Sequence, residues 1–189
     1  KADGTAARLL NATSDIGMQL DSFSDFVTFG IAPATVVFMA LYQQPVAEFP
    51  MWQGAVNSWM LRILVATYVL CTAIRLAKFN VLVETGGPKH VFYGLATTFC
   101  GAFVVLAFIV LSTYEAWELL NWLPLACGLL ALLMVSNFPM PKIQKASSNA
   151  VNVFVVCNSA LAYVFGIFRI YPEYLLGLLV VYLVAGFSW

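Results

Sequence analysis

The residues of this sequence that are best suited to chemistry are aspartates near its N-terminus. Asp21 and Asp25 follow Gly17 at intervals of four residues, so on a helix all three share one face. Carboxylates one helical turn apart repel each other, and a bound cation would offset that repulsion. Because Mg²⁺ and Mn²⁺ prefer carboxylate oxygens, this spacing predicts a divalent metal site.

A solvated helix N-terminus is the alternative interpretation of these acids, since the helix dipole favours acidic side chains there. It would account for Asp21. It does not account for Asp25, which lies inside an apolar segment where a charged side chain is costly. Nor does it explain Asp3, which is followed by a glycine, an alanine and an arginine that share one helical face.

The composition of the chain is that of a membrane protein. Hydrophobic residues make up 62% of it and charged residues 10%, and its mean hydropathy is +0.88. Soluble domains carry about 45–50% apolar and about 25% charged residues. This chain has too little polar surface to cover itself in water, so we expect it to lie in lipid. Its formal net charge of zero gives no indication of a nucleic-acid partner.

Six apolar stretches are candidates for membrane-spanning helices, which need about 20 mostly apolar residues. They run roughly over Met18–Tyr42, Ser58–Phe79, Phe92–Thr113, Leu119–Ser136, Ala150–Phe168 and Tyr171–Phe187. The segments between them carry charge, proline or glycine, as expected where a span ends. The pattern predicts an all-α, polytopic membrane helix bundle that forms one domain over residues 1–189.

The charges of the connecting segments alternate from one side to the other. One side receives Lys1, Arg8, Arg75, Lys78, Lys89, Lys142 and Lys145. The other receives Glu48, Arg62, Glu115, Glu118, Arg169 and Glu173. Because short cytoplasmic loops are enriched in lysine and arginine, the aspartate-bearing side is predicted to be cytoplasmic. We expect an integral protein of the cell (inner) membrane.

The spacing of the N-terminal residues resembles the signature of a known family. From Asp3 to Asp25 it reads D-G-x2-A-R-x8-G-x3-D-x3-D, which is similar to the pattern of the CDP-alcohol phosphotransferases. That pattern begins with one more aspartate, which would immediately precede Lys1. We therefore expect the natural protein to have this aspartate and further N-terminal spans.

Other segments narrow the resemblance to the serine-using branch of that family, the bacterial phosphatidylserine synthases. The similar segments are Leu20–Ala34, Ile74–Val81 and Leu133–Lys142. The resemblance implies transfer of a phosphatidyl group from CDP-diacylglycerol to L-serine, with release of CMP. Membrane lipids surround such an enzyme, and a homodimer is left open.

The resemblance also implies roles for individual residues. It implies ligation of Mg²⁺ or Mn²⁺, as two ions, by Asp3, Asp21 and Asp25, and binding of CDP by Gly4, Ala7, Arg8 and Gly17. Asp25 would in addition take the proton of the serine hydroxyl. The small residues have a second interpretation, since glycine and alanine also serve helix packing in membranes.

Serine needs a cationic partner for its carboxylate, and Arg75 is the first candidate. It lies just inside the end of its apolar segment, where a guanidinium could pair with a carboxylate through two hydrogen bonds. Snorkelling toward lipid headgroups is an equally good interpretation of this arginine. Asn80 and Lys142 are the further candidates for acceptor binding.

Two alternatives remain at this stage. A sibling enzyme could use choline, glycerol phosphate or inositol phosphate, although a phosphate-bearing acceptor would need more basic residues than this chain offers. A small transporter or a non-catalytic membrane scaffold is the alternative of another class. A transporter should place charge near the middle of several spans, whereas the acids here gather at one edge.

Overall fold

The computed structural model describes a bundle of helices joined by short connections. The described residues are 15–43, 50–52, 54–84, 91–137, 139–141, 158, 161, 164–166, 168 and 170–187. The α-helices are α2 (Asp15–Asp25), α3 (Ala32–Gln43), α4 (Ala55–Glu84), α5 (Thr97–Thr113), α6 (Trp117–Leu120), α7 (Leu123–Val135) and α9 (Pro172–Phe187). The other elements are the π-helix η1 (Phe26–Ile31), the 3-10 helix η2 (Pro50–Trp52) and the strands β1 (Val91–Tyr93) and β2 (Pro139–Pro141).

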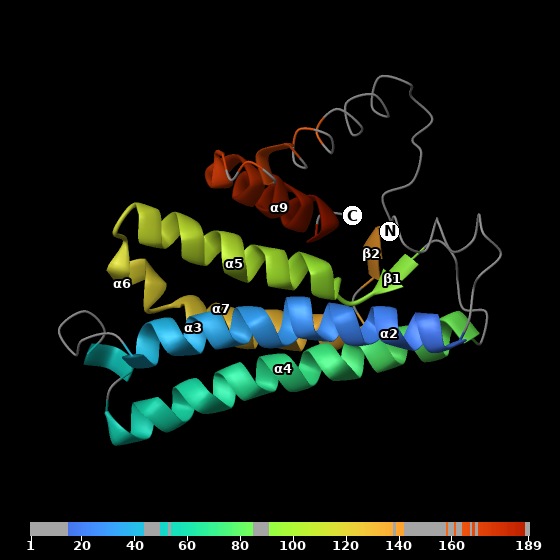
Figure 1. The fold of residues 1–189 in the computed structure, drawn as a ribbon, viewed down its shortest axis with the longest axis horizontal. Helices are drawn as coiled ribbons and strands as arrows, with labels where there is room; N and C mark the ends of the chain where they lie inside the picture. Colours follow the sequence, from blue (N-terminus) through green and yellow to red (C-terminus); the bar gives the residue numbers. More distant parts are fainter. Residues whose placement is uncertain are drawn as a thin grey trace.

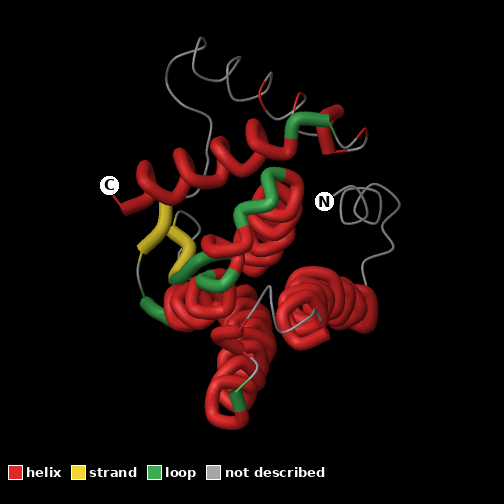
Figure 2. Tube along the Cα trace, turned by 90° about the vertical axis from the view of Figure 1, so that its left-hand side faces the viewer, coloured by secondary structure: helices red, strands yellow, loops and turns green. Residues whose placement is uncertain are grey.

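The long helices lie side by side and share one core. Helices α2 and α3, joined by η1, form a continuous rod beside α4 (Figure 1). Helix α4 packs against α7 along much of its length, and α9 lies over α5. Figure 2 shows the bundle nearly end-on, with α9 crossing the other helices at an angle. The core is apolar and draws on most of these helices, with the buried side chains Val37, Leu41, Leu61, Tyr68, Val104, Leu130 and Met134.

The helices confirm that the chain is an integral membrane protein with a helical fold. Among the described residues, three stretches are long and apolar enough to cross a membrane: Ile16–Tyr42, Ala55–Val81 and Trp117–Val135. Two shorter apolar helices cover Thr97–Thr113 and Pro172–Val184. The predicted span Ala150–Phe168 falls largely outside the described residues, so the count of six spans stays a prediction.

A short two-stranded sheet was not expected from the sequence. Strands β1 and β2 pair antiparallel, with Phe92 opposite Met140. The third predicted span therefore began too early, since its helix starts at Thr97 rather than Phe92. Gly94 separates strand from helix with a φ of +75°, and a Cβ there would lie 2.4 Å from the carbonyl oxygen of Met134. Only glycine fits this turn without strain.

The fourth predicted span is broken into two helices. Helix α6 ends at Leu120 and α7 begins at Leu123, with Pro124 in its first turn. Proline is tolerated there because the first amides of a helix have no partner within it. The indole of Trp52 donates a hydrogen bond to the carbonyl oxygen of Asn121 (3.0 Å), which ties the break to η2.

Candidate active site

Helix α2 carries the two described aspartates of the N-terminal motif at one end of the bundle. Asp21 is exposed and Asp25 is half-buried. The two carboxylates lie one helical turn apart and repel each other electrostatically. The π-helix η1 begins at the residue that follows Asp25. Such π-helical turns inside α-helices are frequent at functional sites.

Arg75 of α4 lies at the same end of the bundle as Asp25. Its guanidinium is half-buried and attracts the Asp25 carboxylate. It donates a hydrogen bond to Oγ1 of Thr97 (3.1 Å) and lies over the ring of Phe79, 5.7 Å from the ring centroid. These contacts hold the arginine inside the bundle, which favours an anion-binding role over snorkelling toward lipid headgroups.

Asn80 connects α4 to the aspartate-bearing helix. Its side-chain amide nitrogen donates a hydrogen bond to Oγ of Ser22 (3.0 Å), a residue between Asp21 and Asp25. The Ser22 hydroxyl can also donate to the carbonyl oxygen of Met18 (3.2 Å), one helical turn earlier. The predicted acceptor residue Asn80 is therefore a direct neighbour of the acidic motif.

Lys78 completes the polar residues at this end of α4. Its ammonium donates a hydrogen bond to Oδ1 of Asn137, just after α7. Helices α2, α4 and α7 and the start of α5 thus meet at this end of the bundle. The contacts that join them are made by Arg75, Lys78 and Asn80. A small polar substrate that reached this end would meet two cations and two carboxylates.

Several predicted site residues cannot be placed. Asp3, Gly4, Ala7, Arg8 and Lys142 lie outside the described residues. Gly17 is described and exposed on α2. Within the described part of the chain, no group of three or more His, Cys, Asp or Glu side chains could hold a metal ion. Because Asp3 of the motif lies outside the described residues, the three-aspartate metal site stays a prediction.

Two polar residues at this site were missed by the sequence analysis. Thr97 is buried and receives the hydrogen bond from Arg75, and Ser22 bonds Asn80. A threonine at the start of an apolar helix is too common to indicate such a role. Ser22 lies between two motif aspartates, which was the only local signal for it.

Comparison with known proteins identifies the family. Residues 1–134 match the CDP-alcohol phosphatidyltransferase family. The chain belongs to the CDP-alcohol phosphatidyltransferase family. The aspartates of α2 and the Arg75 end of α4 both fall inside the matched range. Membership confirms the resemblance that the spacing from Asp3 to Asp25 predicted.

Three relatives of this chain share one name, CDP-diacylglycerol–serine O-phosphatidyltransferase. The protein of that name from Bacillus subtilis (strain 168) is 38% identical over 146 residues, which cover 76% of this chain and 68% of the relative. The one from Helicobacter pylori (strain J99) is 33% identical over 166 residues, covering 86% of this chain and 64% of the relative. The one from Methanocaldococcus jannaschii is 29% identical over 185 residues, covering 97% and 75%.

Proposed function

We propose that this protein transfers the phosphatidyl group of CDP-diacylglycerol to the hydroxyl of L-serine, giving phosphatidylserine and CMP. The observation that carries the proposal is the shared name of its relatives from three distant organisms, all CDP-diacylglycerol–serine O-phosphatidyltransferases. The grouping of Asp25, Arg75 and Asn80 at one end of the bundle supports it. An acid, a cation and an amide suit an amino-acid acceptor.

In the proposed reaction, the serine hydroxyl oxygen attacks the phosphorus of the phosphatidyl group. A new oxygen–phosphorus bond forms, the bond to the CMP oxygen breaks, and the electron pair leaves with CMP. The hydroxyl proton passes to the carboxylate of Asp25. A carboxylate is a weak base, so much of the rate must come from holding the two substrates in line.

A divalent cation, Mg²⁺ or Mn²⁺, would be held by Asp21 and Asp25 together with Asp3. The two described carboxylates fit such an ion, because they supply hard oxygen donors one turn apart on a single helix. When bound, two such ions would neutralise the diphosphate and orient it for displacement. Gly4, Ala7, Arg8 and Gly17 would bind the CDP part of the substrate.

Arg75 would bind the carboxylate of serine. It already donates to Thr97, and its fork of five N–H groups leaves others for a substrate. Asn80 and Lys142 would support the acceptor. The electrostatic attraction between Arg75 and Asp25 supports this, since the proposed anchor of serine would then act near the proposed proton acceptor.

The protein would work in the cell (inner) membrane with this end facing the cytoplasm. Support comes from the sorting of charges, since Lys78 and Arg75 lie at the aspartate end and Glu115, Glu118 and Glu173 at the other. Helix ends in Figure 1 agree with that sorting: α2 begins, and α4 and α7 end, on the same side. A homodimer is compatible with this arrangement and stays a prediction.

A headgroup assay tests the proposal. Purified full-length protein is given CDP-diacylglycerol and, one at a time, labelled serine, choline, glycerol phosphate and inositol phosphate. Labelled phosphatidylserine with stoichiometric CMP is the expected result. Product from another alcohol in preference to serine would identify a sibling activity, and no CMP release with any alcohol would contradict the transfer itself.

A further inference from the structure

The inward face of the first membrane span does not follow the period of an α-helix. Its buried and half-buried positions include Met18, Ser22, Asp25, Phe29, Pro33, Val37 and Leu41. From Met18 to Leu41 six steps cover 23 residues, a mean spacing of about 3.8 residues, whereas an α-helix has 3.6 residues per turn. The π-helix η1 supplies the difference, because the amide of Ala32 donates to the carbonyl oxygen of Val27, five residues earlier.

Without η1 a different set of side chains would face inward. In an unbroken α-helix, Gln19 and Phe23 would lie on the same face as Val37, because they precede it by close to five and four whole turns. Phe23 is instead 68% exposed. One extra residue rotates the preceding helix by about 100°, and this rotation brings Ser22 and Asp25 to the side of α4.

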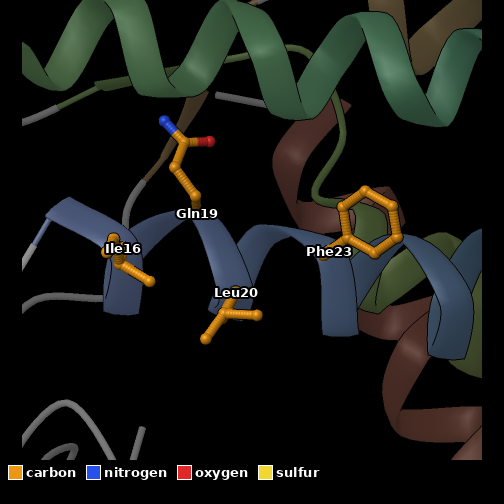
Figure 3. A pocket seen from close by; sticks show the side chains of 4 residues that line it. All are labelled: Ile16, Gln19, Leu20 and Phe23. Carbon is orange, nitrogen blue, oxygen red and sulfur yellow. The ribbon is translucent and has the colours of Figure 1, made fainter.

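The stripe that this rotation turns outward is visible on α2. Ile16, Gln19, Leu20 and Phe23 line an open, apolar depression of about 320 Å³ (Figure 3). Ile16 is 73% exposed and Leu20 65% exposed. An apolar stripe facing out, with Asp25 turned toward the bundle, is the reverse of a soluble amphipathic helix, and it suits a helix in lipid that borders a polar site.

Helices α4 and α5 hold the π-helical segment from two sides. The hydroxyl of Tyr68, a fully buried residue of α4, donates a hydrogen bond to the carbonyl oxygen of Phe29 (2.9 Å). On α5, a Cβ added at Gly101 would lie only 2.8 Å from the Cα and the carbonyl oxygen of Phe29. The same added atom at Gly30 would lie 2.9 Å from Cγ2 of Thr72. The segment is therefore closely packed against both helices.

We propose that Tyr68 is a positioning residue for the transfer reaction. By binding the Phe29 carbonyl it holds η1 in its π-helical form, and η1 in turn directs Asp25 toward Arg75. Tyr68 itself touches neither substrate. The inference rests on the proposed function, because it assigns Asp25 the role of proton acceptor.

The first test removes only the hydroxyl. Tyr68→Phe keeps the ring in the core but removes the hydrogen bond to the Phe29 carbonyl. This loosens η1 and allows the preceding helix to rotate, with Asp25 turned away from Arg75.

We expect kcat to fall at least about tenfold. KM for serine, which Arg75 of α4 would bind, should stay within about twofold of wild type. KM for CDP-diacylglycerol should rise, because the same rotation turns Gly17 and Asp21 of α2. Tyr114→Phe is the matched control: it also removes a tyrosine hydroxyl bond, to Glu173 (3.0 Å) at the opposite end, and should keep wild-type kcat.

A second variant disturbs the segment from the other side. Gly101→Ala places a methyl group against the Phe29 backbone, and we expect the same loss of kcat with an unchanged KM for serine. Gly177→Ala on α9 is its control, because nothing lies within 4 Å of the added carbon. This pair keeps the inference testable if Tyr68→Phe does not yield monodisperse protein.

A third variant separates register from stability. Deleting the exposed Thr28 of η1 removes the extra residue, so an ordinary α-helix would then direct Asp25 inward. In the Tyr68→Phe background this deletion should restore kcat several-fold. A further loss of activity would count against the register explanation.

The inference would be overturned if Tyr68→Phe kept wild-type kcat, or if KM for serine changed together with kcat as in general destabilisation. Failure of the proposed function is a separate outcome, visible in the wild-type protein as transfer to an alcohol other than serine. The Tyr68 comparison would then be repeated with that alcohol, and the same kcat criterion would decide it.

Discussion

Two arginines of α4 lie in opposite halves of the bundle and have different surroundings. Arg62 stacks between aromatic rings, 4.8 Å from the ring centroid of Trp59 and 5.4 Å from that of Tyr42, and donates to the Tyr42 hydroxyl (3.2 Å). Arg75 instead attracts a carboxylate and donates to a buried threonine. The same residue type thus serves in two ways on one helix.

The difference shows how neighbours decide what a cation in a membrane helix can do. Trp59 is 61% exposed and Tyr42 44% exposed, so the aromatic pair around Arg62 resembles the belt that anchors a helix at the membrane interface. Arg75 lies beside a buried threonine and near the carboxylate of Asp25. We therefore expect changes at the Arg75 end to alter chemistry and changes at the Arg62 end to alter anchoring.

Removal of divalent cations should have the largest effect on activity, because the predicted metal site lies in the Arg75 half of the bundle. Excess EDTA is expected to abolish phosphatidyl transfer, since the motif carboxylates would lose the ions that neutralise the diphosphate. Added Mg²⁺ or Mn²⁺ should restore it, as measured by CMP release. Full activity in excess EDTA would contradict the metal site.

Replacement of each arginine by lysine should separate the two halves. Arg75→Lys keeps the charge but loses the planar fork, and loss of a charge-assisted hydrogen bond of about 1.5–3 kcal/mol should raise KM for serine about tenfold to a hundredfold. Arg62→Lys should leave it within about twofold. Initial rates against serine concentration measure both. An unchanged KM in Arg75→Lys would move the acceptor carboxylate elsewhere, and Lys142 would be the next candidate.

The smallest expected effect concerns the hydrogen bond that links the end of α5 to the start of α9. The bond from Tyr114 to the Glu173 carboxylate raises the pKa of the Tyr114 phenol above its usual value of 10.0, and the negative charge of Glu173 adds to this. Because the folded-state pKa is the higher one, the stabilisation is present below the unfolded pKa and is lost as pH rises through the folded pKa. Tyr114→Phe should lower Tm by less than about 3 °C at pH 8, and the difference should shrink above pH 10. A difference that grew with pH would contradict this sign.

The features that carry the family could be predicted from the sequence because they are local. The aspartate spacing depends on one helix, and the apolar stretches need only composition and length. Arg75 and Asn80 were found because few polar residues interrupt those stretches, and the structure brings both to the motif. Their roles as acceptor ligands stay predictions.

Other features could not be predicted because they depend on distant partners. The form of the segment Phe26–Ile31 depends on Tyr68 of α4 and on the missing side chain of Gly101, and both lie far from it in the sequence. The pairing of β1 with β2 joins residues almost fifty positions apart in the chain. Thr97 acquires its partner only when α5 packs beside α4.

The most direct test of the account is a comparison of wild type with Asp25→Asn, which keeps the shape of the side chain and removes the base. Wild type should convert labelled serine to labelled phosphatidylserine, and Asp25→Asn should lose turnover by a factor of about 10² to 10⁴. Binding of CDP-diacylglycerol, measured in parallel on monodisperse protein, should persist in the variant, because Asp3 and Asp21 would still hold metal and the asparagine keeps one oxygen donor. Equal rates of labelled product from the two proteins would contradict the assignment of the chemistry to the aspartate end of α2.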